Sequence, residues 1–346
     1  MVIRVDEGAV LPKYFYTWLT SSAVVERLQG LAESRSGTFP QITFDDVGFL
    51  ELPLPGLPEQ RAIAATLGAL DDKIELNRKM NATLEAMARA LFRDWFVDFG
   101  PTRAKMEGST PYLSPDLWSL FPDRLDDEGK PEGWIVRTLG DVADQIAMGP
   151  FGSNIKVETF VEEGIPVISG AHLRGLQLND KDYNFVTVAH ADKLGRSNVR
   201  RGDVVFTHAG NIGQVAIIPE TAWFDRYVIS QRQFYMRCNL NLISPLFVVH
   251  YFHSPEGKHR LLANSSQVGV PSIARPATYL KSIEICCPPR AILDEFDRAV
   301  SVLHLKVGKN ELESRTLAQT RDLLLPRLMS GELRVAEAES LAREVA

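Results

Sequence analysis

The residues best suited to contact a nucleic acid lie in the segment Gly149–Lys156, which reads Gly-Pro-Phe-Gly-Ser-Asn-Ile-Lys. Its glycines would let the backbone approach a phosphate, Asn154 can read an adenine edge, and Lys156 can bind a phosphate or a guanine. Ser153 is a further donor in this segment. An ordinary Gly-Pro turn is the alternative, and the segment lacks the Gly-Lys-Ser/Thr ending of a nucleotide-binding loop.

Further polar side chains are expected on loops near strand ends, where base-reading groups usually sit. These candidates are His172, Arg174, His208, Asn211 and Gln214. A basic cluster that contains Arg200 and Arg201 could clamp a phosphate or form a charged turn. For each of these residues, a solvated surface without a ligand is the alternative interpretation.

Catalytic and metal-binding patterns are weak in this sequence. Asp123 and the Glu128-Gly129-Lys130 run superficially match a nuclease set. Those carboxylates fall in one irregular segment, whereas a metal needs them to converge from adjacent strands. Cys286 and Cys287 have no second pair, so buried strand cysteines are expected rather than a zinc site. We therefore expect no catalytic residues, no metal and no cofactor held by this chain itself.

The composition is that of a globular protein. The chain has 346 residues, of which 45% are hydrophobic and 24% charged, which suits two or three domains. It has no apolar run of membrane-spanning length and no signal-peptide pattern, so a cytoplasmic protein is expected. The net charge is −6, yet residues 134–289 carry 15 Lys and Arg against 13 Asp and Glu. This distribution is compatible with DNA contact through that region alone.

Two long helices are expected to position these groups. From Pro58 to Phe96, apolar residues recur at alternating steps of four and three, which is a heptad pattern. The expected seam contains Ile63, Leu67, Leu70, Ile74, Asn77, Asn81, Leu84 and Leu91. Aligning the chain with itself so that Asn77 falls on Asn310 gives a second seam with Phe296, Val300, Leu303, Val307, Asn310, Leu317 and Leu324. The shared register favours pairing of the two helices within the chain as a coiled coil. A plain helical hairpin and a homodimer are the alternatives. The seam asparagines would fix the register of the pair.

The approach to each helix repeats as well, since Leu50–Pro55 aligns with Ile283–Pro288 at the same shift. The chain is therefore expected to contain a duplicated module that ends in a long helix. Because the second module begins near Trp134, roughly a hundred residues of the first are expected to be absent before Met1.

The pattern predicts a mixed α/β protein of six parts. They are the end of a first module (1–56), the first long helix (57–97), an irregular linker (98–133), a complete module (134–289), the second long helix (290–333, helical to about Leu325) and a polar tail (334–346). In the first part we expect a strand at Met1–Val5, a helix at Phe15–Leu31 and a strand at Val47–Leu54. In the complete module we expect strands at Ile165–Ile168, Val204–Thr207, Val215–Ile218, Val228–Ile229, Phe234–Met236 and Ile283–Cys287, with helices at Leu246–Phe252 and Gly257–Ala263.

Several of these motifs together resemble a known family. Gly133-Trp134, Leu139-Gly140-Asp141 and Gly149–Lys156 resemble the start of a target recognition domain in the specificity subunits of type I restriction–modification enzymes. Pro58-Glu59-Gln60 looks like the opening of that family's first conserved helix. The second helix departs from the pattern, because it begins with Ala291-Ile292-Leu293 instead.

The resemblance implies an antiparallel coiled coil that holds two recognition domains apart, each reading half of a split double-stranded DNA target. It implies a non-catalytic subunit, with S-adenosylmethionine bound by methylation subunits and ATP with Mg²⁺ bound by a restriction subunit. A truncated chain that assembles through its helices without reading a full target is the alternative.

Overall fold

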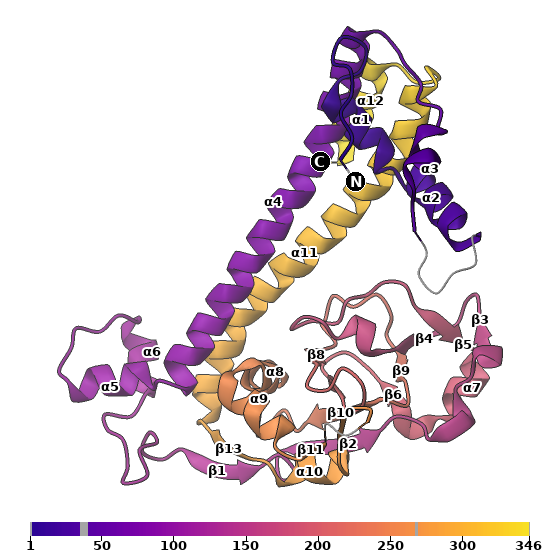
Figure 1. Cartoon of the computed structure of the whole chain (residues 1–346). Helices are drawn as coiled ribbons and strands as arrows, with labels where there is room; N and C mark the ends of the chain where they lie inside the picture. The colour runs from indigo at the N-terminus through magenta and orange to yellow at the C-terminus, as the bar shows by residue number, and fades with distance from the viewer. Residues whose placement is uncertain (1, 35–40, 267–268, 346) are drawn as a thin grey trace. The chain divides into compact units, whose positions relative to one another are not determined.

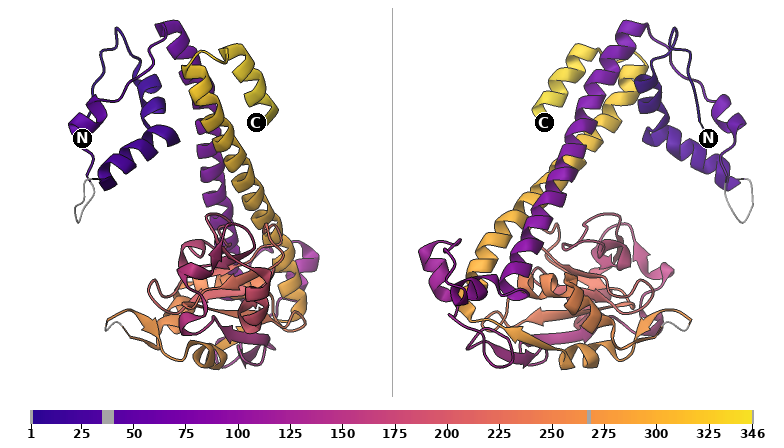
Figure 2. Two further views of the ribbon diagram at one scale, coloured as in Figure 1. Left: turned by 90° about the vertical axis from the view of Figure 1, so that its right-hand side faces the viewer. Right: turned by 60° about the vertical axis from the view of Figure 1, so that its left-hand side comes forward.

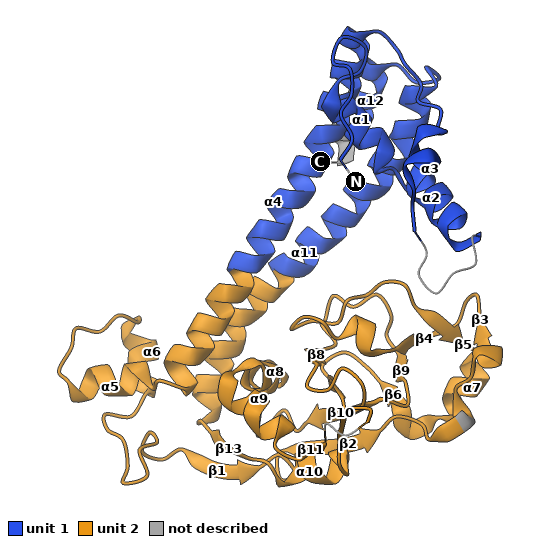
Figure 3. Ribbon diagram, viewed as in Figure 1, with its two compact units in different colours: residues 1–83, 306–346 blue, residues 84–305 orange. Residues whose placement is uncertain are grey.

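The computed structural model describes residues 2–34, 41–266 and 269–345 (Figure 1). The chain forms two compact units, one of residues 1–83 with 306–346 and one of residues 84–305 (Figure 3). The predicted mixed α/β class with two long helices is confirmed. None of the helices in the described part of the chain is long and apolar enough to cross a lipid bilayer.

The two long helices are α4 (Leu57–Phe96) and α11 (Arg290–Met329), each of 40 residues. Pro53 and Pro55 lie just before the start of α4. Because proline is not tolerated in a helix interior but is tolerated near the first turn, the helix begins after them. The predicted end of the second helix near Leu325 was wrong. Pro326 lies inside the last turn of α11, where its missing N–H removes only one hydrogen bond, and the helix ends before Gly331 at φ 77°.

In unit 1 the two helices pair antiparallel. Asp71 accepts from Arg321 at 2.7 Å, whereas Asn81, further along α4, contacts Asn310, which precedes Arg321 in α11. The seam residues Ile63, Leu67 and Leu70 pack with Leu317 and Leu324 in one buried cluster. Of the other predicted seam residues, Asn77, Asn310, Phe296, Val300 and Val307 are buried, while Ile74, Asn81, Leu84, Leu91 and Leu303 are half-buried.

A polar layer interrupts this seam. The Asn77 side-chain amide donates to Glu313 Oε2 at 2.7 Å and to Ser314 Oγ at 3.2 Å. The Asn310 amide donates to Asn81 Oδ1 at 2.7 Å. Because shifting either helix by one turn would break these bonds inside an apolar seam, the layer fixes the register of the pair.

The rest of unit 1 is helical. Its helices are α1 (Pro12–Leu19), α2 (Ser22–Ser34), α3 (Phe44–Gly48) and α12 (Val335–Val345). Within unit 1, the start of α4 lies beside the end of α11. Figure 2 shows α1–α3 on one side of this pair and α12 on the opposite side.

Several predictions for unit 1 were wrong. The predicted helix Phe15–Leu31 is broken at Ser21, whose hydroxyl accepts from the Val24 amide. The strand predicted at Val47–Leu54 is replaced by α3 and an extended segment, since Thr43 and Asp46 form a helix-starting capping box. Residues 2–5 form no strand, and Met1 lies outside the described residues. The expected polar tail contains α12 because its alanine, leucine and valine residues recur at helical spacing.

Unit 2 is built on two sheets. The four-stranded sheet has the order β2 (Ala143–Met148), β10 (Gln233–Cys238), β7 (Val204–Thr207), β8 (Val215–Ile217). The five-stranded sheet has the order β3 (Phe160–Val161), β5 (Asn184–Val186), β4 (Ile165–Ile168), β9 (Tyr227–Ile229), β6 (Asn198–Val199). Two further pairs are β1 (Ile135–Thr138) with β13 (Glu284–Cys287), and β11 (Ser265–Ser266) with β12 (Ser272–Ile273).

The four-stranded sheet is covered on both faces. Val205 and Tyr235 pack with Ile229 of the other sheet, whereas Val204 and Phe206 pack with helix residues of unit 2. Burial on both faces explains why β7 is a continuous apolar run rather than an alternating one. All six strands predicted in the complete module are present.

The helices of unit 2 are α5 (Gly100–Met106), α6 (Pro115–Leu120), α7 (Val188–Lys193), α8 (Pro245–His253), α9 (Pro255–Leu262) and α10 (Pro276–Ser282). The two predicted helices of the complete module correspond to α8 and α9. The linker expected to be irregular contains α5 and α6, which begin at Gly100-Pro101 and Pro115, residues suited to a helix start.

The predicted internal repeat is visible in the order of the helices. The shift that places Asn77 on Asn310 carries the first residues of α1, α2 and α4 onto the first residues of α8, α9 and α11. It also places the start of α3 next to the start of α10. The two units therefore share one series of helices, and unit 2 has sheets that the described part of unit 1 does not contain.

Candidate nucleic-acid interface

One end of the four-stranded sheet gathers most of the predicted residues. β2 and β7 end there, at Met148 and Thr207, and β10 begins there, with Gln233 opposite Thr207. The segment Gly149–Lys156 leaves β2 at this end, and His208 follows β7. Antiparallel pairing thus joins residues that are far apart in the sequence.

Gly149 is required where this segment leaves the sheet. A Cβ atom at this position would lie 2.0 Å from the Ser230 carbonyl oxygen, which is a hard clash with backbone. The Gly149 amide donates to the Gln233 carbonyl at 2.8 Å and so ties the segment to β10. The glycine predicted to allow approach to a phosphate therefore serves close packing between two backbones.

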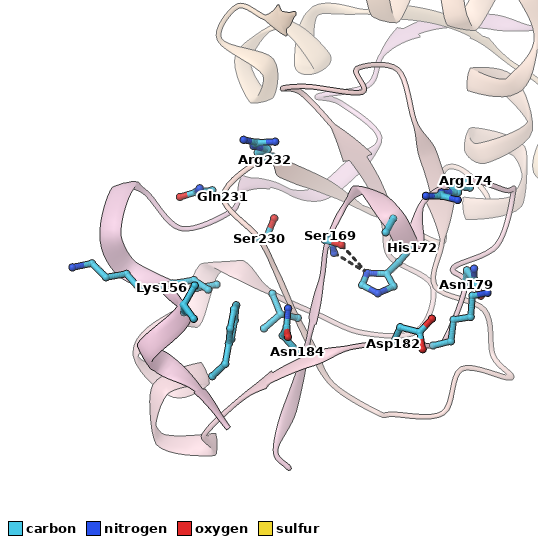
Figure 4. A pocket seen from close by; sticks show the side chains of 16 residues that line it. Lys156, Ser169, His172, Arg174, Asn179, Asp182, Asn184, Ser230, Gln231 and Arg232 are labelled. Carbon is cyan, nitrogen blue, oxygen red and sulfur yellow. Dashed lines mark hydrogen bonds between the residues drawn. The ribbon is translucent and has the colours of Figure 1, made fainter. Parts of the chain in front are cut away.

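A hollow of about 540 Å³ lies beside this sheet end (Figure 4). Three predicted residues, Lys156, His172 and Arg174, line it. Its other polar lining residues, which sequence reasoning did not single out, are Ser169, Asn179, Lys181, Asp182, Asn184, Ser230, Gln231 and Arg232. They come from three separate segments, so no spacing in the sequence could have indicated them.

The hollow is strongly cationic. Lys156, Arg174, Lys181 and Arg232 are exposed side chains, and Asp182 is the one carboxylate among the described lining residues. None of these four cations forms an ion pair with another described residue. By contrast, Arg201, elsewhere in the unit, is paired with Asp225. Unpaired cations around a hollow are the arrangement that an anionic ligand requires.

His172 belongs to the wall of the hollow rather than to its exposed surface. Its Nδ1 accepts from the Ser169 amide at 2.9 Å (Figure 4). Its ring stacks on that of Tyr183, with 4.3 Å between the ring centroids. Burial lowers the pKa of His172, so the neutral imidazole is favoured. The His172 carbonyl accepts from the Asn179 amide at 2.9 Å, which closes the loop that carries Arg174.

His208, Asn211 and Gln214 lie at the same sheet end but do not line the hollow. The His208 Nε2 donates to the Gln231 carbonyl at 3.1 Å, and burial lowers the pKa of this imidazole. The Gln214 side-chain oxygen accepts from Thr207 at 3.4 Å. Asn211 is exposed, so it is the freest of the three to meet a ligand.

The structure separates Arg200 and Arg201 from this group. They precede β7, at the opposite end of the sheet from His208. The Arg201 guanidinium donates to the Ala222 carbonyl at 2.8 Å and pairs with Asp225 at 2.7 Å. Nearby, Arg237 forms an ion pair with Asp203, and burial nevertheless raises the pKa of that carboxyl group. Arg201 is thus committed to a structural contact.

A second hollow, of about 480 Å³, is also lined in part by the segment Gly149–Lys156. Phe151, Asn154, Lys193 and Arg196 help to line it, and Phe151 is 78% exposed. The Asn154 carbonyl accepts from His190 Nε2 at 2.7 Å, which anchors the segment to α7. The side chain of Ser153 lies outside what the structure describes.

The metal-binding and nuclease-like patterns of the sequence form no metal site in the described ranges. No cluster of three His, Cys, Asp or Glu side chains there could hold a metal ion. Lys130 is paired with Glu128, one of the two nuclease-like carboxylates. Burial raises the pKa of Cys286 and of Cys287 to about 11, so both remain thiols at neutral pH.

Comparisons with known proteins point to one family. A family model described as "Type I restriction modification DNA specificity domain" matches residues 1–86. The chain is 28% identical to the type I restriction enzyme HindI specificity subunit of Haemophilus influenzae, over 96% of this chain and 80% of that protein. It is 27% identical to the MjaIX specificity subunit of Methanocaldococcus jannaschii, over 96% and 72%.

A solved structure supports the fold. The S subunit of a type I restriction–modification system from M. genitalium superposes with a TM-score of 0.51 at 18% identity, over 94% of this chain and 74% of that one. The motifs, the paired long helices and the sequence similarity over nearly the whole chain agree, and each makes this protein similar to the specificity subunits of type I restriction–modification enzymes.

Proposed function

We propose that this chain is the DNA sequence-recognition subunit of a type I restriction–modification complex and that unit 2 reads one half of a bipartite target. The observation that carries this proposal is the hollow with four unpaired cations, Lys156, Arg174, Lys181 and Arg232. Duplex DNA is the polyanion that such a surface fits, since each phosphate bound by Lys or Arg releases counterions.

The side chains around the hollow would serve two roles: some position the protein on the duplex, and others read the bases. The four cations hold phosphates and thereby set the register of the protein on the duplex, without distinguishing bases. Amide side chains at the rim, Asn184 and Gln231, can each both donate and accept, which suits them to base edges. Asn154, which lines the second hollow, and Asn211, in the loop after β7, are also exposed and extend this set.

The partners follow from the same proposal. Methylation subunits would supply S-adenosylmethionine, and a restriction subunit would supply ATP with Mg²⁺, so this chain binds neither. Both relatives are specificity subunits of type I restriction enzymes, which supports a role within a larger complex. The chain contributes recognition and a scaffold and performs no chemistry of its own.

A binding-site selection with the chain and its methylation subunits tests the proposal. We expect enrichment of one contiguous half-site, with affinity that falls steeply as salt rises because phosphate contacts release counterions. A bipartite consensus would mean that a second reading surface exists. The absence of any enrichment would contradict the proposal and favour the second candidate, an assembly-only coiled-coil protein. The register-fixing layer of Asn77 and Asn310 is the observation that favours that candidate.

A further inference from the structure

Two large apolar side chains next to the predicted DNA-contacting residues are turned to solvent. Phe151 is 78% exposed and Val157 is 79% exposed, the highest values for large apolar side chains in the described part of unit 2. A single exposed apolar side chain is not unusual in a soluble protein, so the surroundings of Phe151 decide what its exposure means.

The backbone that carries Phe151 is fixed on both sides. Pro150, which is buried, precedes it and restricts φ, and Gly152 follows with φ 56°, so the chain turns immediately after the ring. The Phe151 carbonyl accepts from the Asn154 amide at 3.4 Å, and the Asn154 carbonyl is bound by His190 Nε2 at 2.7 Å. Because the turn is already ordered, a ligand that covers the ring has little backbone entropy to remove.

Unpaired cations surround this turn. Phe151 lines the second hollow together with Lys193 and Arg196, which are both exposed. Neither cation forms an ion pair with another described residue, and no Asp or Glu is among the described residues that line this hollow. The same segment borders the first hollow at Lys156. An exposed aromatic ring therefore lies between sequence neighbours that line two cationic hollows.

Duplex DNA accounts for the ring and for the cations together. Phosphates run along both edges of each DNA groove, and cations in two hollows can bind them while the ring faces the base pairs. A protein partner fits less well, because lysine is depleted at protein–protein interfaces. A lipid surface is flat on this scale and would leave the hollows unfilled. Apolar side chains that enter a groove of DNA are known to insert between base pairs and to unstack them.

We propose that Phe151 inserts between two base pairs of the target and thereby selects a deformable step. Pyrimidine–purine steps, TA and CA/TG, are the easiest to unstack, so one of them should occupy this position of the half-site. The ring has no hydrogen-bonding group, so this preference arises without a polar contact to a base. The inference rests on the proposed function and adds readout of DNA deformability to the reading of base edges by amides.

The test uses the complex of the full chain with its methylation subunits and duplexes that carry the selected half-site. In these duplexes 2-aminopurine, whose fluorescence rises when the base is unstacked, replaces each adenine in turn. We expect a rise at one step with the wild type and its loss with Phe151→Ala. Phe151→Trp retains a flat aromatic ring and should retain the rise. Any base flipped by the methylation subunits is the same in all complexes, so the difference between variants reports Phe151 alone.

Affinity gives a second readout at the step located in this way. The wild type should bind a duplex with TA at this step about tenfold more tightly than one with AA. Phe151→Ala should lose this preference and keep the salt slope, because it removes no phosphate contact. Leu240→Ala is the matched control. Leu240 is 63% exposed and follows β10 at the opposite end of the four-stranded sheet, so this variant should keep both the fluorescence rise and the preference.

The possible failures are distinguishable. Identical fluorescence at every position for the wild type and Phe151→Ala, with DNA binding intact, would overturn the inference and leave the proposed function standing. The absence of DNA binding by the wild-type complex would overturn both. Binding to anionic lipid vesicles that Phe151→Ala abolishes, without any change in 2-aminopurine fluorescence, would assign the ring to a membrane surface and would overturn the inference as well.

Discussion

At the scale of single residues, what distinguishes the arginines of the candidate interface from other arginines in unit 2 is whether a carboxylate already binds them. Arg174 and Arg232 are exposed and have no carboxylate partner among the described residues, whereas Arg201 and Arg237 are held by Asp225 and Asp203. An arginine already bound to a carboxylate gives up that contact to bind a phosphate, so the unpaired arginines are the better candidates.

Replacing Arg174 therefore has a specific expected result. Arg174→Ala should weaken DNA binding by the reconstituted complex about equally for all sequences and should lower the salt slope by about one counterion. Arg200→Ala is the matched control, because Arg200 is also an exposed arginine but lies at the opposite end of the sheet. Fluorescence anisotropy over a series of salt concentrations measures both. Equal losses for the two variants would place the interface elsewhere.

A buried pair of histidines predicts how stability depends on pH. His250 Nε2 lies 3.2 Å from His304 Nε2, and burial lowers the pKa of both, that of His304 to about 4. Between pH 4 and the unfolded value of about 6.5, the unfolded chain binds protons that the folded chain does not. Stability should therefore fall as the pH is lowered through this window. Asp297, whose pKa burial raises to about 6, acts in the opposite direction.

The contribution of His304 is isolated by comparing slopes. For the wild type, the free energy of unfolding should rise with pH in this window more steeply than for His304→Gln, by up to about 1.4 kcal/mol per pH unit. His259→Gln makes the same chemical change at an exposed histidine and serves as the matched control. Urea unfolding at several pH values gives these slopes. A slope that does not change in His304→Gln would show that this residue does not titrate on unfolding.

At the scale of elements, the long helices combine apolar packing with one polar layer. Leu67 and Leu317 are fully buried between α4 and α11, and Asn77 and Asn310 are buried beside them. The apolar layers supply most of the stabilisation, because removing a buried side chain loses both transfer free energy and packing. The asparagines contribute specificity of register instead.

Truncating one apolar layer tests the seam. Leu67→Ala should lower the free energy of unfolding by about 2–5 kcal/mol, because it leaves a cavity between the helices. Leu76→Ala makes the same chemical change on the same helix at a side chain that is 52% exposed, and it should cost less than about 0.5 kcal/mol. Denaturant unfolding of the two variants measures the difference. Similar small losses in both would contradict the seam.

At the scale of the whole molecule, the two units repeat one series of helices and differ in what covers them. Unit 2 holds sheets against α8 and α10, whereas the described part of unit 1 holds none against α1 and α3.

The sequence by itself determined the parts of this protein that depend on local periodicity and on repetition. The heptad spacing located α4 and α11, and the internal repeat showed that the two helices share one register. Continuous apolar runs bounded by turn residues located β7 and β10, since burial on both faces leaves a local signature. Prediction from apolar periodicity was less reliable where a capping residue starts a helix, as at Ser21 and Thr43. There, one side-chain hydrogen bond can decide where the helix begins.

Only the tertiary structure decided the composition of the candidate site. Lys181 and Arg232 join Lys156 and Arg174 because loops from different strands meet beside one end of the sheet. Arg201 resembles them in sequence but is held by Asp225, a contact made only after the chain folds. A residue in a loop after a strand is positioned by the pairing of that strand with segments that are distant in the sequence. Local sequence patterns do not indicate this pairing.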